Sequence, residues 1–312
     1  QGASVGGLIG YFSPHYYRGN FGGSTIDLCW NEGDVTAHLP EWVTENLSDN
    51  TNSVGNATQF GNVTLGGLIG QVYGVNSEAG KRYMAHINRS FNMGKVTSKR
   101  VTYSGSRICV GGLVGYTDNN QYWEMKNCFN AGSVQGGNDD AAGIAPYFRN
   151  NTPQCASENI YNIGRVTAAR RAYPITANNN RLNATTYFYY DEQMCPDAYI
   201  YSGNTKDISM TTRAMLGNGM RDLLGTDNWV YTPGMYPRIK GLENEAASIA
   251  AATPVYLYEA AGDTENVAAV NHNFTTGSGM HKTKWKVIEG DGIIESIAND
   301  TVYTLISGAR GV

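Results

Sequence analysis

Two short blocks of hydrophobic and polar positions alternate along the first half of the chain. The first block combines glycines with aliphatic residues, and its copies lie at 5–10, 65–70 and 110–115, with a degenerate copy at 141–146. The second block runs aromatic, Asn, any residue, Gly, any residue, Val, and its copies lie at 30–35, 91–96, 129–134 and 161–166. Four copies of each block in strict alternation predict a repeat protein in which each pair of blocks forms one turn.

The distance between the two blocks varies from turn to turn. From the first glycine position of block one to the Asn of block two, the steps are 6 to 31, 66 to 92, 111 to 130 and 142 to 162. A loop of variable length within each turn explains this variation. Residues 37–62 lengthen one connection and predict a surface insertion, and residues 174–176 with 187–190 indicate a weaker fifth turn.

Each position of the unit has a physical role in this interpretation. Paired glycines allow neighbouring backbones to approach closely. Because stacked turns are about 4.8 Å apart, the aromatic residues are expected to pile face to edge inside the core, covering Leu or Val of block one. The Asn-x-Gly step tolerates positive φ and predicts a tight turn after the aromatic residue. The aromatic set comprises Trp30, Phe91, Phe129 and Tyr161.

The fold class that follows is all-β, a β-solenoid of the β-helix kind with a short capping helix. Charged residues make up only 16% of the chain, whereas Gly (38) and Tyr (21) are abundant, which favours strands and turns. Residues 209–216 and 220–224 predict the helix, with Ser209 or Thr211 as N-cap and Gly225 as its stop. Residues 229–231 and 234–239 predict a hairpin, and helix and hairpin together are expected to cover the last turn.

A second domain is predicted after an Ala-rich linker at 245–253. Strand-like runs occur at 255–258, 285–288 and 302–306. We expect a solenoid domain over 1–245 and an immunoglobulin-like β-sandwich over 246–312. About 60 residues is fewer than the roughly 100 of a complete sandwich, so this domain is expected to be incomplete.

The first block resembles the repeats of GLUG-motif proteins, named for Gly-Leu-x-Gly. The resemblance rests on residues 7–10, 67–70 and 112–115 and covers roughly residues 1–240, while Pro146 replaces the last Gly in the fourth copy. It implies a bacterial cell-surface or secreted protein with an adhesive or scaffolding role, and it offers no catalytic residues to carry over. The segment from Trp285 onwards is similar to the central strands of bacterial Ig-like modules.

The composition of the chain narrows the classes of binding partner that we expect for it. The net charge of −4 gives no basic footprint, so nucleic acid is not expected as a partner. No run of about 18 apolar residues is present, so no transmembrane helix is expected; any signal peptide or N-terminal lipid anchor would precede Gln1. Five cysteines lack zinc-ligand spacing and are expected to be mostly buried thiols, with a disulfide left open for an exported protein. They are Cys29, Cys109, Cys128, Cys155 and Cys195.

The motifs of enzymes and metal sites are missing. The five histidines form no H-E-x-x-H motif and are interpreted as exposed loop residues. The adjacent carboxylates Asp139-Asp140 and Asp191-Glu192 are interpreted as solvated turn charges in preference to Ca²⁺ ligands or an acid–base pair. We therefore expect no catalytic residues, no metal and no cofactor. The alternative is a polysaccharide lyase or hydrolase, which three or more acidic or basic residues converging on one face would favour; the sequence shows only scattered charges.

The remaining candidate site is a set of aromatic residues in the loops that join block one to block two. Loops from the same part of successive turns are expected along one edge of the solenoid, where aromatic side chains suit glycans or proteins of a host or bacterial surface. The alternative for Tyr122 and Trp123 is packing over the core. The candidate set is Tyr16, Tyr17, Tyr83, Tyr122 and Trp123.

Overall fold

The computed structural model describes twelve stretches of the chain and the backbone of five further strands. The stretches are 3–13, 23–37, 63–72, 85–98, 108–117, 123–136, 140–146, 157–177, 187–196, 198–199, 206–232 and 235–246. The further strands are β8 (Val75–Asn76), β9 (Arg82–Tyr83), β25 (His272–Asn273), β26 (Ile293–Ser296) and β27 (Val302–Ile306). The predicted insertion at 37–62 lies, apart from its first residue, outside the described residues.

Successive repeats contribute strands in the same order. Repeat 1 supplies β1 (Ala3–Gly6), β2 (Ile9–Phe12), β3 (Ser24–Asp27), β4 (Trp30–Asn31) and β5 (Val35–Ala37). Repeat 2 supplies β6 (Val63–Gly66), β7 (Ile69–Val72), β10 (Ala85–Asn88), β11 (Phe91–Asn92) and β12 (Val96–Ser98). Repeat 3 supplies β13 (Ile108–Gly111), β14 (Val114–Thr117), β15 (Trp123–Asn130) and β16 (Val134–Gln135). Repeat 4 supplies β17 (Ala141–Ala142), β18 (Glu158–Asn162) and β19 (Val166–Thr167), and the predicted fifth turn is present as β20 (Ala172–Tyr173) and β21 (Phe188–Asp191), followed by β22 (Asp207–Met210).

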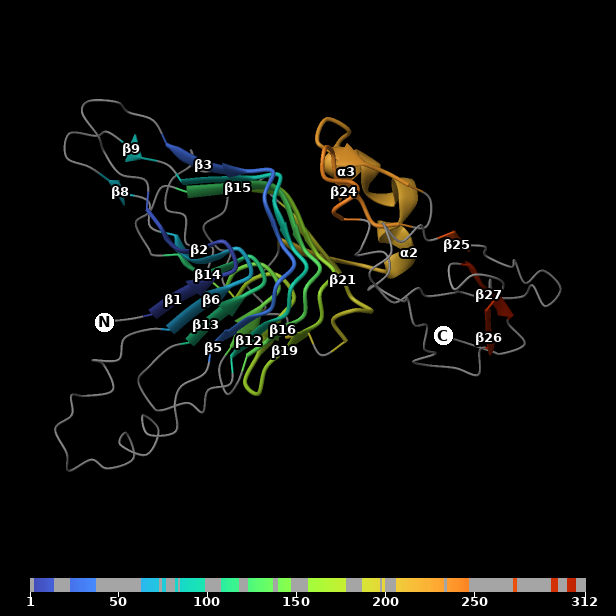
Figure 1. Cartoon of the computed structure of the whole chain (residues 1–312), viewed down its shortest axis with the longest axis horizontal. Helices are drawn as coiled ribbons and strands as arrows, with labels where there is room; N and C mark the ends of the chain where they lie inside the picture. Colours follow the sequence, from blue (N-terminus) through green and yellow to red (C-terminus); the bar gives the residue numbers. More distant parts are fainter. Residues whose placement is uncertain are drawn as a thin grey trace. The chain divides into compact units, whose positions relative to one another are not determined.

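Equivalent strands of successive repeats pair in parallel and form four sheets (Figure 1). Sheet 1 is β1-β6-β13-β17-β20 and sheet 2 is β2-β7-β14. Sheet 3 runs β3-β10-β15-β18-β21-β22, with β4 and β11 paired alongside, and sheet 4 is β5-β12-β16-β19. The prediction of an all-β chain with few helices is confirmed, and the parallel stacking is consistent with a β-helix.

One hydrophobic core draws residues from all four sheets. Leu65 comes from sheet 1, Ile69 from sheet 2, Ile87 from sheet 3 and Val96 from sheet 4, and each is at most 1% exposed. Since no single repeat has enough apolar surface to enclose such a core, the repeats must stack to fold.

The glycines of block one lie where backbones approach closely, as predicted. A Cβ added to Gly112 would lie 2.0 Å from the carbonyl oxygen of Gly143 and 2.5 Å from the side-chain carbonyl carbon of Asn130. Gly67 has the same relation to Gly112, with 2.1 Å between the added Cβ and the Gly112 carbonyl oxygen. No side chain fits there without backbone movement.

The aromatic residues stack in a geometry that differs from the predicted one. The interplanar angles are 20° for Trp30–Phe91, 7° for Phe91–Phe129 and 2° for Phe129–Tyr161, with centroid separations of 6.5, 4.7 and 5.0 Å. The rings are therefore face to face. In-register parallel strands repeat the same side-chain direction at each layer, which makes the ring planes parallel.

Phe91, Phe129 and Tyr161 are buried, but they lie outside the hydrophobic cluster that contains the block-one residues. We had expected them to cover those block-one residues. Cys128 belongs to the core, and Asn130 lies against Gly112. Because side chains alternate along a strand, Phe129 between them points to the opposite face of sheet 3, although it is only 1% exposed. The residue that meets the block-one glycines is the Asn of block two.

Positive φ occurs before the aromatic residue, not at the Asn-x-Gly step where we predicted it. The residues with left-handed backbone are Leu28, Arg89, Asn127 and Asn159, with φ of 52°, 42°, 52° and 57°. The block-two glycines are required for a different reason. A Cβ on Gly94 would lie 2.0 Å from the carbonyl oxygen of Gly33, so these glycines permit close approach between repeats.

The degenerate fourth copy of block one keeps the register of sheet 1. Val110 pairs with Ala141 and Gly111 with Ala142. Sheet 2 ends at β14, and the proline that replaces glycine at 146 has no N–H to continue a ladder there.

By its contacts the chain divides into two compact units, one comprising 1–211 and 223–228, the other 212–222 and 229–312. Two short α-helices, α2 (Thr212–Met215) and α3 (Arg221–Leu224), flank a 3-10 turn at Gly217–Met220. Helix α3 is followed by Gly225 with φ of 75°, as expected of a helix stop. β23 (Trp229–Val230) and β24 (Arg238–Ile239) form the predicted hairpin.

Near the C-terminus, β25, β27 and β26 form an antiparallel sheet, and β27 coincides with the strand predicted at 302–306. The other two predicted strand runs, at 255–258 and 285–288, lie outside the described residues. The domain boundary at 245–246 and the Ig-like sandwich stay predictions.

Candidate functional site

The site that the structure assembles is the outer face of sheet 3. Register places Thr25, His86 and Glu124 side by side on β3, β10 and β15. Two residues later the same strands place Asp27, Asn88 and Lys126 side by side, and Glu158 of β18 follows Lys126. The residues between these two rows, Ile26, Ile87 and Met125, are buried in the core. Strand alternation therefore projects both polar rows away from the core.

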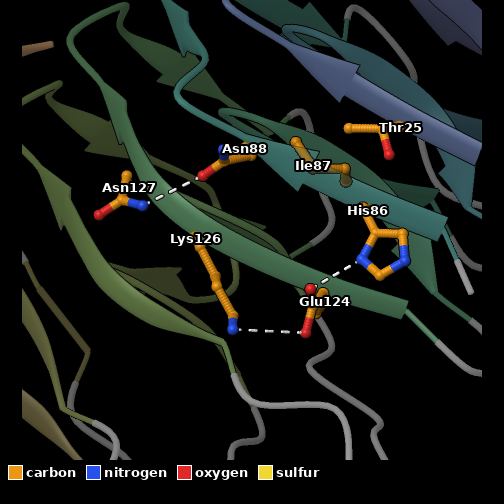
Figure 2. A pocket seen from close by; sticks show the side chains of 7 residues that line it. All are labelled: Thr25, His86, Ile87, Asn88, Glu124, Lys126 and Asn127. Atoms are coloured by element: carbon orange, nitrogen blue, oxygen red, sulfur yellow. Dashed lines mark hydrogen bonds and ion pairs between the residues drawn. The ribbon is translucent and has the colours of Figure 1, made fainter. Parts of the chain in front are cut away.

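These rows line an open pocket of about 390 Å³ (Figure 2). Its lining residues come from the three neighbouring strands β3, β10 and β15, and they are Thr25, His86, Ile87, Asn88, Glu124, Lys126 and Asn127. The volume falls within the range of small-molecule sites. The lining contains no Phe, Tyr or Trp side chain, so a ligand would be recognised mainly through hydrogen bonds and charge.

An ion-pair chain crosses the pocket from strand to strand. His86 Nδ1 lies 2.7 Å from Glu124 Oε1, and Lys126 Nζ lies 3.6 Å from Glu124 Oε2 and 3.4 Å from Glu158 Oε1. The side chains of His86 and Lys126 are about one-third exposed and that of Glu124 is 18% exposed. Glu124 is thus held on both oxygens, which fixes its position between the imidazole and the ammonium group (Figure 2).

A second set of side chains borders the pocket. Arg89 forms a bidentate ion pair with Asp27, with 2.8 Å between Nε and Oδ1. Hydrogen bonding to the Arg89 guanidinium lowers the pKa of Asp27 below its ordinary value. Asn88 Nδ2 also donates to Asp27 at 3.1 Å, and Asn127 donates to Asn88 at 3.1 Å. These amides are oriented by neighbours on both sides.

Inside the stack, a ladder of buried amides maintains the register that aligns the pocket residues. The side-chain Nδ2 of each block-two Asn donates to the Oδ1 of the next, at 2.8 Å from Asn31 to Asn92, 2.9 Å from Asn92 to Asn130 and 2.8 Å from Asn130 to Asn162. Each also donates to the carbonyl of the glycine two residues later, at 2.7 to 2.9 Å. Because a one-residue slip would break every one of these bonds, the ladder specifies a single register.

The ladder ends at a cysteine. Asn162 Nδ2 lies 3.6 Å from Cys195 Sγ, which donates to the carbonyl of Gly164 at 3.4 Å. Burial raises the pKa of Cys195 to about 12 and that of Cys128 to about 12. Cys29, Cys109, Cys128 and Cys195 are free thiols, and three of them are buried, as predicted for most of the cysteines; Cys155 lies outside the described residues.

Of the aromatic residues predicted as a binding edge, only Trp123 has a side chain among the described residues. Tyr16, Tyr17 and Tyr122 lie outside the described residues, and of Tyr83 only the backbone, in β9, is described. Trp123 begins β15 and is 0% exposed in the core. For Trp123 the edge assignment is therefore wrong, because strand alternation turns this side chain inwards together with Met125.

The carboxylates weighed above as Ca²⁺ ligands or as an acid–base pair form contacts with other groups of the protein. Asp140 lies 3.8 Å from Arg170 across an ion pair, and burial raises its pKa. Asp191 was interpreted as a solvated charge, but it is fully buried and accepts hydrogen bonds from the N–H groups of Gln193 and Met194 at 2.9 and 3.2 Å. Asp139 lies outside the described residues. Within the described stretches, no three His, Cys, Asp or Glu side chains are close enough to hold a metal ion.

Sequence reasoning missed His86, Glu124, Lys126 and Glu158, because it treated the charges as scattered and His86 as a loop residue. The signal was present in the repeat. Thr25, His86 and Glu124 each precede the aromatic residue of their repeat by five positions, and Asp27, Asn88, Lys126 and Glu158 precede theirs by three. Aligned on the aromatic residue, these positions share one strand face.

Comparison with known proteins gives no further assignment. No family model matches the chain. Neither the curated proteins nor the solved structures contain a match. The resemblance to GLUG-motif proteins therefore stays a prediction.

Proposed function

We propose that this chain is a non-enzymatic binding protein in which a β-solenoid presents the outer face of sheet 3 to a glycan or a protein. In this proposal the stacked repeats act as a rigid spacer, and the protein serves in adhesion at a bacterial cell surface or in secreted form. The surface location rests on the resemblance of the Gly-Leu-x-Gly blocks.

The observation that carries the proposal is the alignment of polar side chains over three neighbouring strands. Thr25, His86 and Glu124 come from three different repeats, yet they share one row of a sheet whose other face is core. Side chains on stacked strands are held more rigidly than side chains on loops, and a rigid site loses less entropy on binding. A pocket of about 390 Å³ gives this face a concave place for a ligand.

Binding to immobilised glycans and to extracted surface proteins tests the proposal. The wild-type chain should be compared with a double variant, Glu124→Gln with Lys126→Met, which removes one charge of each sign from the pocket. Arg213→Ala, at an exposed position of α2, is the control. Binding that the double variant loses and the control keeps would support the proposal, whereas binding unaffected by the double variant would place the site elsewhere.

A polysaccharide lyase or hydrolase is the second candidate, and one specific observation favours it. His86 and Lys126 lie 2.7 and 3.6 Å from Glu124 on one face, and such convergence is what this alternative requires. Its test is turnover. Release of reducing ends, or of unsaturated products absorbing in the ultraviolet, that Glu124→Gln abolishes would replace the binding proposal with an enzyme.

Among the described residues, no helix is long and apolar enough to cross a bilayer.

A further inference from the structure

The hydrogen-bond donors and acceptors that line the pocket decide which kind of ligand it can bind. Glu124 approaches His86 Nδ1 at 2.7 Å. An ionised carboxylate only accepts hydrogen bonds, so Nδ1 must carry the proton. When the imidazole is neutral, Nε2 is then an acceptor that offers a lone pair to a ligand group that donates, such as a hydroxyl.

Lys126 supplies the complementary donor. Its ammonium group has three protons and two carboxylate neighbours, Glu124 at 3.6 Å and Glu158 at 3.4 Å. The Glu124 contact is too long for a hydrogen bond, so at least one N–H is left for a ligand oxygen. Thr25, on the strand beyond His86, adds a hydroxyl that can donate and accept.

The charge balance of the face disfavours an anionic ligand. Two positive side chains, Arg89 and Lys126, stand against three negative ones, so the formal charge is −1 with His86 neutral. The negative side chains are Asp27, Glu124 and Glu158. Both positive groups already have carboxylate partners within 4 Å. An anion entering the pocket would lose its hydration without gaining an unpaired cation, which is unfavourable.

We infer that the pocket on sheet 3 binds an uncharged, hydroxyl-rich ligand, that is, a neutral sugar unit, with His86 Nε2 accepting from one hydroxyl and Lys126 Nζ donating to another. This inference rests on the proposed function and names its ligand class. Thr25 and the oriented amides of Asn88 and Asn127 complete a lining that contains both donors and acceptors. Such a lining suits hydroxyl groups, each of which both donates and accepts.

Calorimetric titration of the full chain with defined oligosaccharides tests the inference. The neutral probes are gluco-, manno- and xylo-oligosaccharides, and the anionic probes are oligogalacturonate and a sulfated oligosaccharide. We expect a neutral probe to bind at least tenfold more tightly than either anionic probe. His86→Phe, which keeps a ring but has no nitrogen, should weaken that binding at least tenfold, while Arg213→Ala should leave it unchanged.

The outcomes separate this inference from the proposed function. Tighter binding of an anionic probe, lost in the Glu124→Gln, Lys126→Met double variant, would overturn the neutral-sugar assignment and leave the face as a binding site. Capture of a protein partner through the same face, without sugar binding, would do likewise. Binding of a neutral sugar that His86→Phe leaves intact would overturn the assignment of His86. The thermal unfolding of His86→Phe must match that of the wild type for this comparison to count.

An O-methylated form of the neutral probe, which lacks hydroxyl donors, provides an independent test that needs no variant. It should bind at least tenfold more weakly than the unmodified probe.

Discussion

At the scale of single residues, the glycines of block two show that the same motif position can require glycine in one repeat and tolerate a side chain in another. Gly94 faces the carbonyl oxygen of Gly33 in the preceding repeat, at 2.0 Å from the place of an added Cβ. For Gly33 the nearest atom is Asn31 Oδ1 at 3.6 Å, an ordinary contact. The requirement for glycine therefore comes from the neighbouring repeat and not from the turn itself.

Gly94→Ala is expected to lower the free energy of unfolding by about 1–3 kcal/mol, since the added methyl group overlaps backbone atoms that cannot move independently. Gly33→Ala, at the equivalent position of repeat 1, should change it by less than about 0.5 kcal/mol. Urea denaturation of the two variants provides the comparison. Equal losses would show that glycine is needed for the turn, which would contradict the close-approach explanation.

The Asp27–Arg89 pair predicts a pH dependence. Because Arg89 lowers the pKa of Asp27 in the folded state, the folded chain binds fewer protons at this carboxyl than the unfolded chain. The pair's contribution is thus present above the unfolded pKa and is lost as the pH falls through the folded pKa.

Asp27→Asn should therefore destabilise the chain at pH 7 and have a smaller effect at pH 3, which lies below the unfolded pKa, so that the wild type has already lost part of the pair's contribution. Denaturation midpoints at pH 7, 5 and 3 measure this. Asp227→Asn, at an exposed carboxylate, is the control and should show no such convergence. A destabilisation by Asp27→Asn that stays constant over this pH range would contradict the role assigned to the ion pair.

At the scale of elements, the amide ladder and its terminal cysteine predict a pattern of thiol reactivity. Burial raises the pKa of Cys128 and of Cys195 to about 12, so at pH 8 only about one part in 10⁴ of each is thiolate. Cys29 is partly exposed.

Iodoacetamide at pH 8 should modify Cys29 in the native chain while Cys128 and Cys195 stay unmodified. All three should react in urea, and mass spectrometry of the peptides distinguishes them. Modification of Cys195 in the native chain as fast as that of Cys29 would mean that it does not close the ladder as described.

The sequence predicted which elements exist better than it predicted which way they face. Local strand and helix-stop signals identified the hairpin at 229–239 and the helix stop at Gly225. Block periodicity identified five repeats and the close-packed glycines. It placed the aromatic stack on the wrong face because the interior position is taken by a polar residue, Asn130, whose hydrogen bonds run between repeats and are invisible within one repeat. The pocket was missed for the same reason, since Thr25, His86 and Glu124 meet only once repeats are in register.

At the scale of the whole molecule, the parallel pairing of successive repeats places residues that differ between repeats side by side on one face of a sheet. The residues that form glycine contacts, core and amide ladder recur from repeat to repeat, whereas the outward positions differ, as Thr25, His86 and Glu124 do. A stack of repeats with this division keeps its fold while its outer face is free to acquire specificity.

The register of the repeats decides whether the pocket exists, because its residues meet only if equivalent residues of successive repeats lie side by side. Electron paramagnetic resonance of paired nitroxides tests it at the outer positions of sheet 4, where Gln135 pairs with Thr167 and Thr97 with both Thr36 and Gln135. Cys29 and Cys155 are first replaced by serine, the residue that repeat 2 has at the position of Cys29.

Labels at Gln135 and Thr167 should show strong spin–spin broadening, since adjacent strands are about 4.8 Å apart. Labels at Thr36 and Thr167, separated by three strand spacings or about 14 Å, should show much weaker broadening. Broadening of equal strength in the two pairs, or its absence at 135 and 167, would contradict the in-register stack and with it the pocket on sheet 3.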